Sequence, residues 1–128
     1  MQGRTISQRV IECAFEVSNA LGAGFLEKVY ENALCVSLEQ AGIHFVKQKV
    51  FDVHFRQRIV GTYVADIVVE DKLLIELKAL SGFNKDHEAQ VMNYLKASGL
   101  KVGLLINFGT PRIGIKRIVR QYDENHPI

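Results

Sequence analysis

The chain has 128 residues, of which 48% are hydrophobic and 23% are charged, and its net charge is only +2. This length predicts a single domain over residues 1–128, with loose tails at 1–4 and 121–128. No apolar run approaches the roughly 18 residues that span a membrane, and we see no secretory signal. Cys13 and Cys35 have apolar neighbours. That setting favours buried, reduced thiols and a cytoplasmic protein, and it argues against a structural zinc site.

Two helices are expected at the start of the chain. Apolar residues recur at helical spacing over residues 5–21, and Gly22 is suited to end that helix. A second helix is expected over residues 26–41, before Gly42. A dinucleotide-binding fingerprint is excluded, because Glu27 stands where G-x-G-x-x-G requires its last glycine and a helix precedes the motif.

Three strands are expected next, over residues 43–53, 59–69 and 73–78. The second and third are rich in Val, Ile and Leu and flank a polar Glu-Asp-Lys tip, so they form a hairpin. Strands this apolar are typical of sheets that are buried on both faces. Three charges interrupt them, Asp66, Glu76 and Lys78. A buried charge is costly unless it is paired or bound to a metal, so these three residues require an explanation.

The length of the hairpin loop decides whether the three charges meet. Glu76 and Lys78 share a face, because side chains two apart on a strand point the same way. A three-residue loop pairs Val69 with Leu73 and places Asp66 opposite Glu76. A two-residue loop would send the two acids to opposite faces. We expect the three-residue loop, since it gives the buried acids a common purpose.

Two carboxylates and an ammonium on rigid strands suit a hard divalent cation. Mg²⁺ prefers oxygen ligands, commonly one or two carboxylates together with water and substrate phosphate. A bound cation lowers the pKa of a water and so generates a nucleophile at neutral pH. A nearby lysine orients that water or stabilises developing negative charge. Asp66, Glu76 and Lys78 therefore predict a centre that hydrolyses phosphodiesters.

The rest of the chain completes an α/β domain. A helix is expected over residues 85–98, with Asn84 as its N-cap, and a buried strand over 101–108 follows it. The crossover predicts parallel pairing, and residues 113–119 are expected at the sheet edge. The predicted fold is a central mixed sheet, made of an antiparallel meander and a parallel strand after a crossover helix, flanked by helices.

Positive charge is unevenly spread along the chain. Residues 89–122 contain no acid and six basic residues. A second basic cluster comprises Lys47, Lys49, Arg56 and Arg58. Such clusters are either ordinary solvated surface or a face that follows a phosphate backbone beside the acidic site.

Asp66 followed by Glu76-Leu77-Lys78 resembles the active-site motif of the PD-(D/E)xK nuclease superfamily. Ala65 stands where the superfamily's name has a proline. Two further motifs support the resemblance. One is similar to the G-x-x-E-x-x-Y signature of the GxxExxY family, and the other to the Q-x-x-x-Y motif of RecB-like members; their residues are Gly24, Glu27, Tyr30, Gln90 and Tyr94.

The resemblance implies a restriction-endonuclease-like core that covers nearly the whole chain. It implies a Mg²⁺ or Mn²⁺ ion with these ligands: Glu27, Asp66, Glu76 and the carbonyl of Leu77. The implied catalytic residues are Asp66, Glu76, Lys78, Gln90 and Tyr94. Three further residues are expected to contact the ligands or substrate phosphate, namely Tyr30, Glu31 and His87. Tyr30 is expected to hydrogen-bond Glu27 or Asp66.

The implied function is metal-dependent hydrolysis of nucleic acid, with DNA the favoured substrate. Similar small nucleases include dimeric junction resolvases, so a homodimer is compatible with the pattern. Two alternatives remain open at this point. One is a nucleic-acid- or protein-binding module that keeps the nuclease fold without the chemistry. The other is a structural protein in which Lys78 only neutralises the acids.

Overall fold

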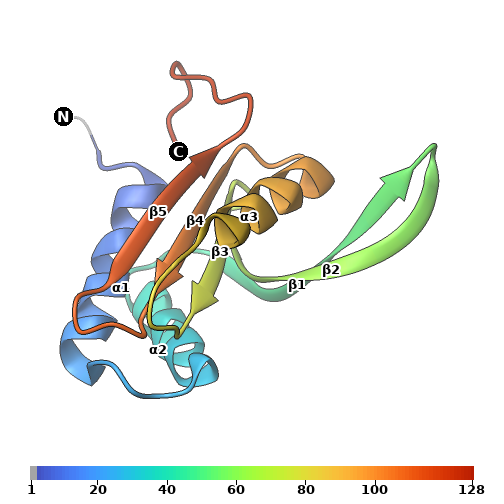
Figure 1. Ribbon diagram of the computed structural model, residues 1–128. Coiled ribbons are helices and arrows are strands. Elements are labelled where there is room, and N and C mark those ends of the chain that lie inside the picture. The colour runs from blue at the N-terminus through green and yellow to red at the C-terminus, as the bar shows by residue number, and fades with distance from the viewer. Residues whose placement is uncertain (1–2) are drawn as a thin grey trace.

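A computed structural model describes residues 3–128 as a five-stranded sheet with helices on both faces (Figure 1). In chain order the elements are α1 (Ile6–Leu21), α2 (Glu27–Gln40), β1 (Phe45–Phe55), β2 (Arg58–Val69), β3 (Leu73–Lys78), α3 (Lys85–Ser98), β4 (Val102–Asn107) and β5 (Gly114–Val119). The strands lie side by side in sequence order. The β3–β4 pair is parallel and the other pairs are antiparallel. The predicted α/β architecture is confirmed.

Two hydrophobic cores sandwich the sheet. One face packs against α1 and α2 through residues such as Val10, Leu34 and Ile75. The other face packs against α3 through Leu74 and Val91. β3 is therefore covered on both sides, which is why its sequence is almost uniformly apolar. Within residues 3–128, no helix is both long enough and apolar enough to cross a membrane.

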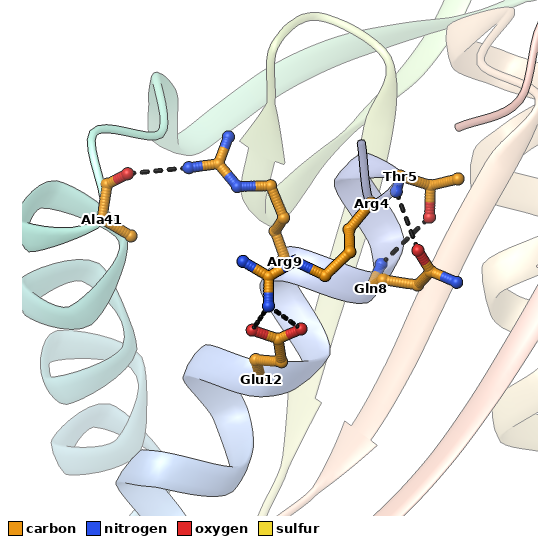
Figure 2. A network of polar contacts seen from close by, with 6 residues as sticks. All are labelled: Arg4, Thr5, Gln8, Arg9, Glu12 and Ala41. Atoms are coloured by element: carbon orange, nitrogen blue, oxygen red, sulfur yellow. Dashed lines mark hydrogen bonds and ion pairs between the residues drawn. The ribbon is translucent and has the colours of Figure 1, made fainter. Parts of the chain in front are cut away.

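Polar contacts fix α1 at its start and tie it to α2. The Thr5 side chain accepts the N–H of Gln8 in a capping box at the start of this helix. Arg9 Nη2 donates to the carbonyl of Ala41, just past the end of α2, at 2.8 Å (Figure 2). Arg4, just before α1, forms an ion pair with Glu12 within the helix. Residues 1 and 2 of the expected N-terminal tail lie outside the described residues.

The segment 121–128 is not the loose tail that was expected. Tyr122 and Ile128 pack against the core that α1 and α2 cover. Ser7 Oγ in α1 donates to the carbonyl of Ile128 at 2.8 Å. The contacts join residues at opposite ends of the sequence, such as Ser7 and Ile128. No local pattern in the sequence could therefore reveal that this segment packs against the body.

The outer parts of β1 and β2, residues 49–65, form a curved hairpin that extends away from the body, and we call it the arm (Figure 1). Its turn has two residues, Arg56 and Gln57, both with positive φ, so the strands extend closer to the turn than the expected bounds of 53 and 59. Apolar side chains near its end, such as Phe55 at 59% and Val60 at 62%, are exposed. Burial on both faces, expected for the strand over 59–69, is wrong at this end, because among residues 3–128 no other element covers the end of the arm.

Candidate functional site

The loop between β2 and β3 sets the register of the site. Glu70 and Asp71 both have positive φ, and the N–H of Lys72 donates to the carbonyl of Val69 at 2.9 Å. Val69 pairs with Leu73 across the resulting three-residue loop. This is the register that places Asp66 beside Glu76, so the expected odd loop is confirmed.

β2 and β3 separate where the acids stand. Their ladder ends at the pair Ile67–Ile75. Beyond it, side chains replace the ladder: the N–H of Asp66 donates to Glu76 Oε1 at 3.3 Å, and the N–H of Leu77 donates to Asp66 Oδ2 at 2.8 Å. The N–H and C=O of one strand residue point to the same side, so the Leu77 carbonyl is directed into this opening as well.

A kink in β1 lies opposite Asp66. Gln48 has a φ of 51°, and the β1–β2 ladder passes from Lys47 to Lys49 without pairing it. Its Nε2 donates to Glu31 Oε1 at 2.9 Å, and Lys28 Nζ lies 3.1 Å from Glu31 Oε2. Glu31 is only 2% exposed, so this pairing satisfies a buried carboxylate. No sequence signal pointed to Gln48, because a left-handed residue within a strand has no local signature.

Burial, together with neighbouring negative charge, raises the pKa of the acids at the site. Burial, followed by the charge of Asp66, raises the pKa of Glu76 to about 8. Burial also raises the pKa of Asp66, against the stabilising N–H of Leu77. The pKa of Glu27 is raised by burial and then by the charge of Asp66, which places Glu27 within electrostatic reach of the pair. The site is thus an acidic cluster that binds protons more readily than free carboxylates do.

α3 lies on the sheet face opposite α1 and α2, which is the face that Glu76 and Lys78 share with Leu74. Lys78 Nζ donates to Gln90 Oε1 in a long bond of 3.4 Å; the catalytic role of Gln90 stays a prediction. The pKa of Tyr94 is raised by burial and then by the charges of Glu76 and Asp66, so its phenol lies close to both acids. The helix therefore brings both residues of the Q-x-x-x-Y motif to the site.

The side chains of His87 and Tyr30 both form hydrogen bonds with backbone groups. His87 Nδ1 accepts the N–H of Asn84 at 3.2 Å, in the capping box that starts α3; its role toward phosphate stays a prediction. The Tyr30 hydroxyl donates to the carbonyl of Gly22 at 2.6 Å and accepts the N–H of Phe25 at 3.1 Å. The expected bond from Tyr30 to Glu27 or Asp66 is therefore wrong. Tyr30 instead fixes the glycine-rich loop from which α2, and with it Glu27, begins.

Asn107 is a residue that the sequence analysis missed. It is 2% exposed, and its Nδ2 donates to the Leu80 carbonyl at 3.0 Å. Its Oδ1 accepts the N–H groups of Leu80 and Gly109 at 2.9 and 3.0 Å. A Cβ on Gly109 would lie 2.1 Å from the Leu80 oxygen. This close packing fixes the chain immediately after Lys78; the signal was a polar residue at the end of an apolar strand.

The donor set fits a hard cation in its chemistry. Two carboxylates and a directed carbonyl, from Asp66, Glu76 and Leu77, offer only oxygen, which Mg²⁺ and Mn²⁺ prefer. Among residues 3–128, however, no three His, Cys, Asp or Glu side chains are already grouped around one position for an ion. Glu27 is exposed and stands apart from the pair, so its share in binding an ion requires a bridging water or a change of rotamer.

The sheet and the acid pair beside a lysine define a protein with a restriction-endonuclease-like core. Residues 4–118 match the family model of the PD-(D/E)XK nuclease superfamily. The match covers most of the chain, which therefore belongs to this superfamily of phosphodiester hydrolases.

Solved structures resemble this chain at low sequence identity. The crystal structure of SSO0001 has a TM-score of 0.56 and 18% identity and covers 94% of this chain. Our chain spans 60% of that neighbour's length. An alkaline exonuclease (LHK-Exo) from Laribacter hongkongensis has a TM-score of 0.46 and 14% identity. The match covers 94% of this chain and 73% of the exonuclease chain. No curated protein matches the sequence.

Proposed function

We propose that the protein is a metal-dependent nuclease that hydrolyses phosphodiester bonds in nucleic acid, with DNA as its substrate. One observation carries the proposal: the N–H of Asp66 donates to the Glu76 carboxylate, and the N–H of Leu77 donates to the Asp66 carboxylate. Two acids are thereby held together beside Lys78 at a gap between strands. The motif of Gly24, Glu27 and Tyr30 supports a place in the GxxExxY family.

Asp66 and Glu76 would hold Mg²⁺ or Mn²⁺ with the Leu77 carbonyl, and Glu27 would support them. The cation supplies a bound water of lowered pKa and a positive charge against the phosphate. Lys78 is half-buried, and it would orient the attacking water or neutralise charge on the phosphate as the bond breaks. Gln90 keeps the lysine ammonium facing the acids through its 3.4 Å bond.

A cleavage assay tests this proposal. Labelled single-stranded, duplex and four-way-junction DNA, together with RNA, are incubated with the protein in Mg²⁺, Mn²⁺ or EDTA. We expect cleavage that needs the cation and favours DNA. Removing a catalytic lysine or acid commonly lowers the rate by a factor of about 10²–10⁴.

Two matched pairs of variants identify the site. Lys78→Ala should abolish cleavage, whereas Lys72→Ala, which changes an exposed lysine in the hairpin loop, should not. Asp66→Asn should abolish cleavage, whereas Asp52→Asn on the exposed arm should not. Absence of cleavage from every substrate, with wild-type protein that is folded, would contradict the proposal and favour the binding module.

A further inference from the structure

We propose that the groove between the arm and α3 holds an unpaired stretch of the substrate strand, with one base stacked on Tyr94. The inference rests on the proposed nuclease function and names its substrate class, single-stranded or frayed nucleic acid in preference to blunt duplex. It gives the arm a role that the acids and Lys78 do not explain.

The groove has the size of a ligand site. Its volume is about 650 Å³, and it is lined by Val53 and His54 of the arm, by Tyr63, and by Tyr94 and Lys96 of α3. Pockets of roughly 300–1,000 Å³ enclose small organic ligands. A base or two fits in this space. A double helix does not, because its major groove alone is about 12 Å wide.

Two of the groove's lining residues, Tyr63 and Tyr94, belong to a stack of three aromatic rings. Tyr63 and Tyr94 stack at 3.9 Å between ring centroids and are 4° from parallel. Phe51 continues the stack at 5.3 Å from Tyr63. The Tyr63 hydroxyl donates to the Tyr94 carbonyl at 2.8 Å, which joins the arm to α3. Single-strand binding sites use such rings as platforms, since every base has a flat face that stacks.

Tyr94 links this wall to the acids. It is the last ring of the stack and is partly exposed. It also lies one helical turn from Gln90, which bonds Lys78. A base stacked on Tyr94 would therefore place its own phosphate near Asp66 and Glu76. On this view the ring of Tyr94, rather than its hydroxyl, is the part that contacts substrate.

The charge around the groove suits a nucleic-acid backbone. Lys96 stands exposed at its rim. Lys49 lies over the outer ring, with Nζ 5.5 Å from the Phe51 centroid, and it also pairs with the exposed Asp71 at 3.3 Å. Arg56 and Arg58 extend the positive charge to the end of the arm, where Asp52 is the nearest acid in sequence. Basic residues beside stacking rings are the combination that binds single strands without sequence preference.

Binding in EDTA, where cleavage cannot occur, tests the proposal. The probe is a single-stranded DNA oligonucleotide with 2-aminopurine, whose fluorescence falls when it stacks on an aromatic ring. We expect quenching on binding, and at least tenfold weaker binding of the blunt duplex of the same sequence. Tyr94→Ala should weaken single-strand binding about tenfold or more and remove the quenching, while Tyr94→Phe should retain both.

Two lysine variants test the groove without changing an aromatic ring, so a folding defect in the ring variants cannot explain their result. Lys96→Ala at the groove should weaken binding severalfold, and Lys101→Ala, at an exposed lysine outside the groove lining, should not. Equal affinity for duplex and single strand would overturn the proposal. So would quenching that survives Tyr94→Ala, or a loss in Tyr94→Phe as large as that in Tyr94→Ala.

The cleavage assay separates the two proposals. Cleavage by the wild type, together with binding that ignores Tyr94 and Lys96, would refute the groove and leave the nuclease. Ring-dependent binding of single strands without any cleavage would refute the nuclease and leave the groove as a binding site.

Discussion

The Asp66 and Glu76 side chains lie next to each other, and each carboxylate accepts a backbone N–H from the strand that carries the other acid. The N–H of Leu77 binds Asp66, and the N–H of Asp66 binds Glu76. Burial raises the pKa of both acids, and the Asp66 charge adds to the effect on Glu76. The folded protein therefore holds these acids together against their repulsion, which is the arrangement expected where a cation completes a site.

Replacing one acid by its amide should stabilise the cation-free protein. An asparagine at position 66 can still accept the Leu77 N–H, but it carries no charge to oppose Glu76. We expect Asp66→Asn to raise stability at pH 8 in EDTA by about 1 kcal/mol, or roughly 3–5 °C in Tm. Thermal denaturation measures this, with Asp52→Asn on the exposed arm as the control that changes little. An unfolded Asp66→Asn protein would contradict the electrostatic account.

The raised pKa of Glu76 predicts the direction of the pH dependence. The folded protein binds a proton at Glu76 up to about pH 8, whereas the unfolded chain releases it near the ordinary carboxyl range. The stability linked to that proton is complete at low pH and is lost as pH rises to about 8, by up to about 1.4 kcal/mol per pH unit. Asp66 and Glu27 shift in the same direction.

Urea denaturation in EDTA between pH 5 and pH 9 measures this dependence. Wild-type stability should fall across the range, and Glu76→Gln should flatten the profile. A wild-type profile that rises with pH, or one that Glu76→Gln leaves unchanged, would show that Glu76 is ionised in the folded state at neutral pH.

The β2–β3 hairpin is the element on which the site depends. A slip of one residue would move every side chain of a strand to the opposite face. Its loop places Glu70 and Asp71 at positive φ, at 54° and 55°. The Asp71 side chain is exposed and pairs only with Lys49, at 3.3 Å. The loop is thus held in a strained conformation by the strands that it connects.

Glycine at position 71 should relieve that strain. We expect Asp71→Gly to raise the free energy of unfolding by about 0.5–1 kcal/mol, since an exposed ion pair contributes little. Lys72→Gly, at a residue outside the positive-φ set, should instead lower it. Chemical denaturation of the two variants checks the comparison. Equal losses in both would mean that Asp71 does not adopt the left-handed conformation.

The sequence predicted this hairpin well, for a physical reason. Three charges in two apolar strands are tolerable only if they meet, and that requirement selects one loop length. α3 was equally predictable, because Asn84 and Gly99 mark its ends. The kink at Gln48 and the contacts of Asn107 were not predictable. Both depend on partners far along the chain. Gln48 has no local pattern that distinguishes it, and a polar residue at the end of an apolar strand, the one signal at Asn107, does not reveal its contacts.

At the scale of the whole molecule, the sequence predicted the packing of the body but not the exposure of the arm. The segments over 43–53 and 59–69 were correctly predicted as strands, but a local pattern cannot tell whether a core lies beneath them. The end of the arm carries exposed apolar and basic side chains, as at Phe55 and Arg56. The packing of Ile128 near α1 is likewise a long-range outcome. Local pattern thus predicted the elements, and long-range contacts determined where the arm and the tail lie.

The proposed hydrolysis depends on a divalent cation that binds between Asp66 and Glu76. Calorimetric titration of the protein with Mn²⁺ at pH 7, in buffers of different ionisation enthalpy, tests this most directly. We predict saturable binding that releases a proton, because Glu76 must lose its proton to bind the ion. Asp66→Asn and Glu76→Gln should abolish it, and Asp52→Asn should retain it. Absence of binding, or binding that persists unchanged in Asp66→Asn, would contradict the account.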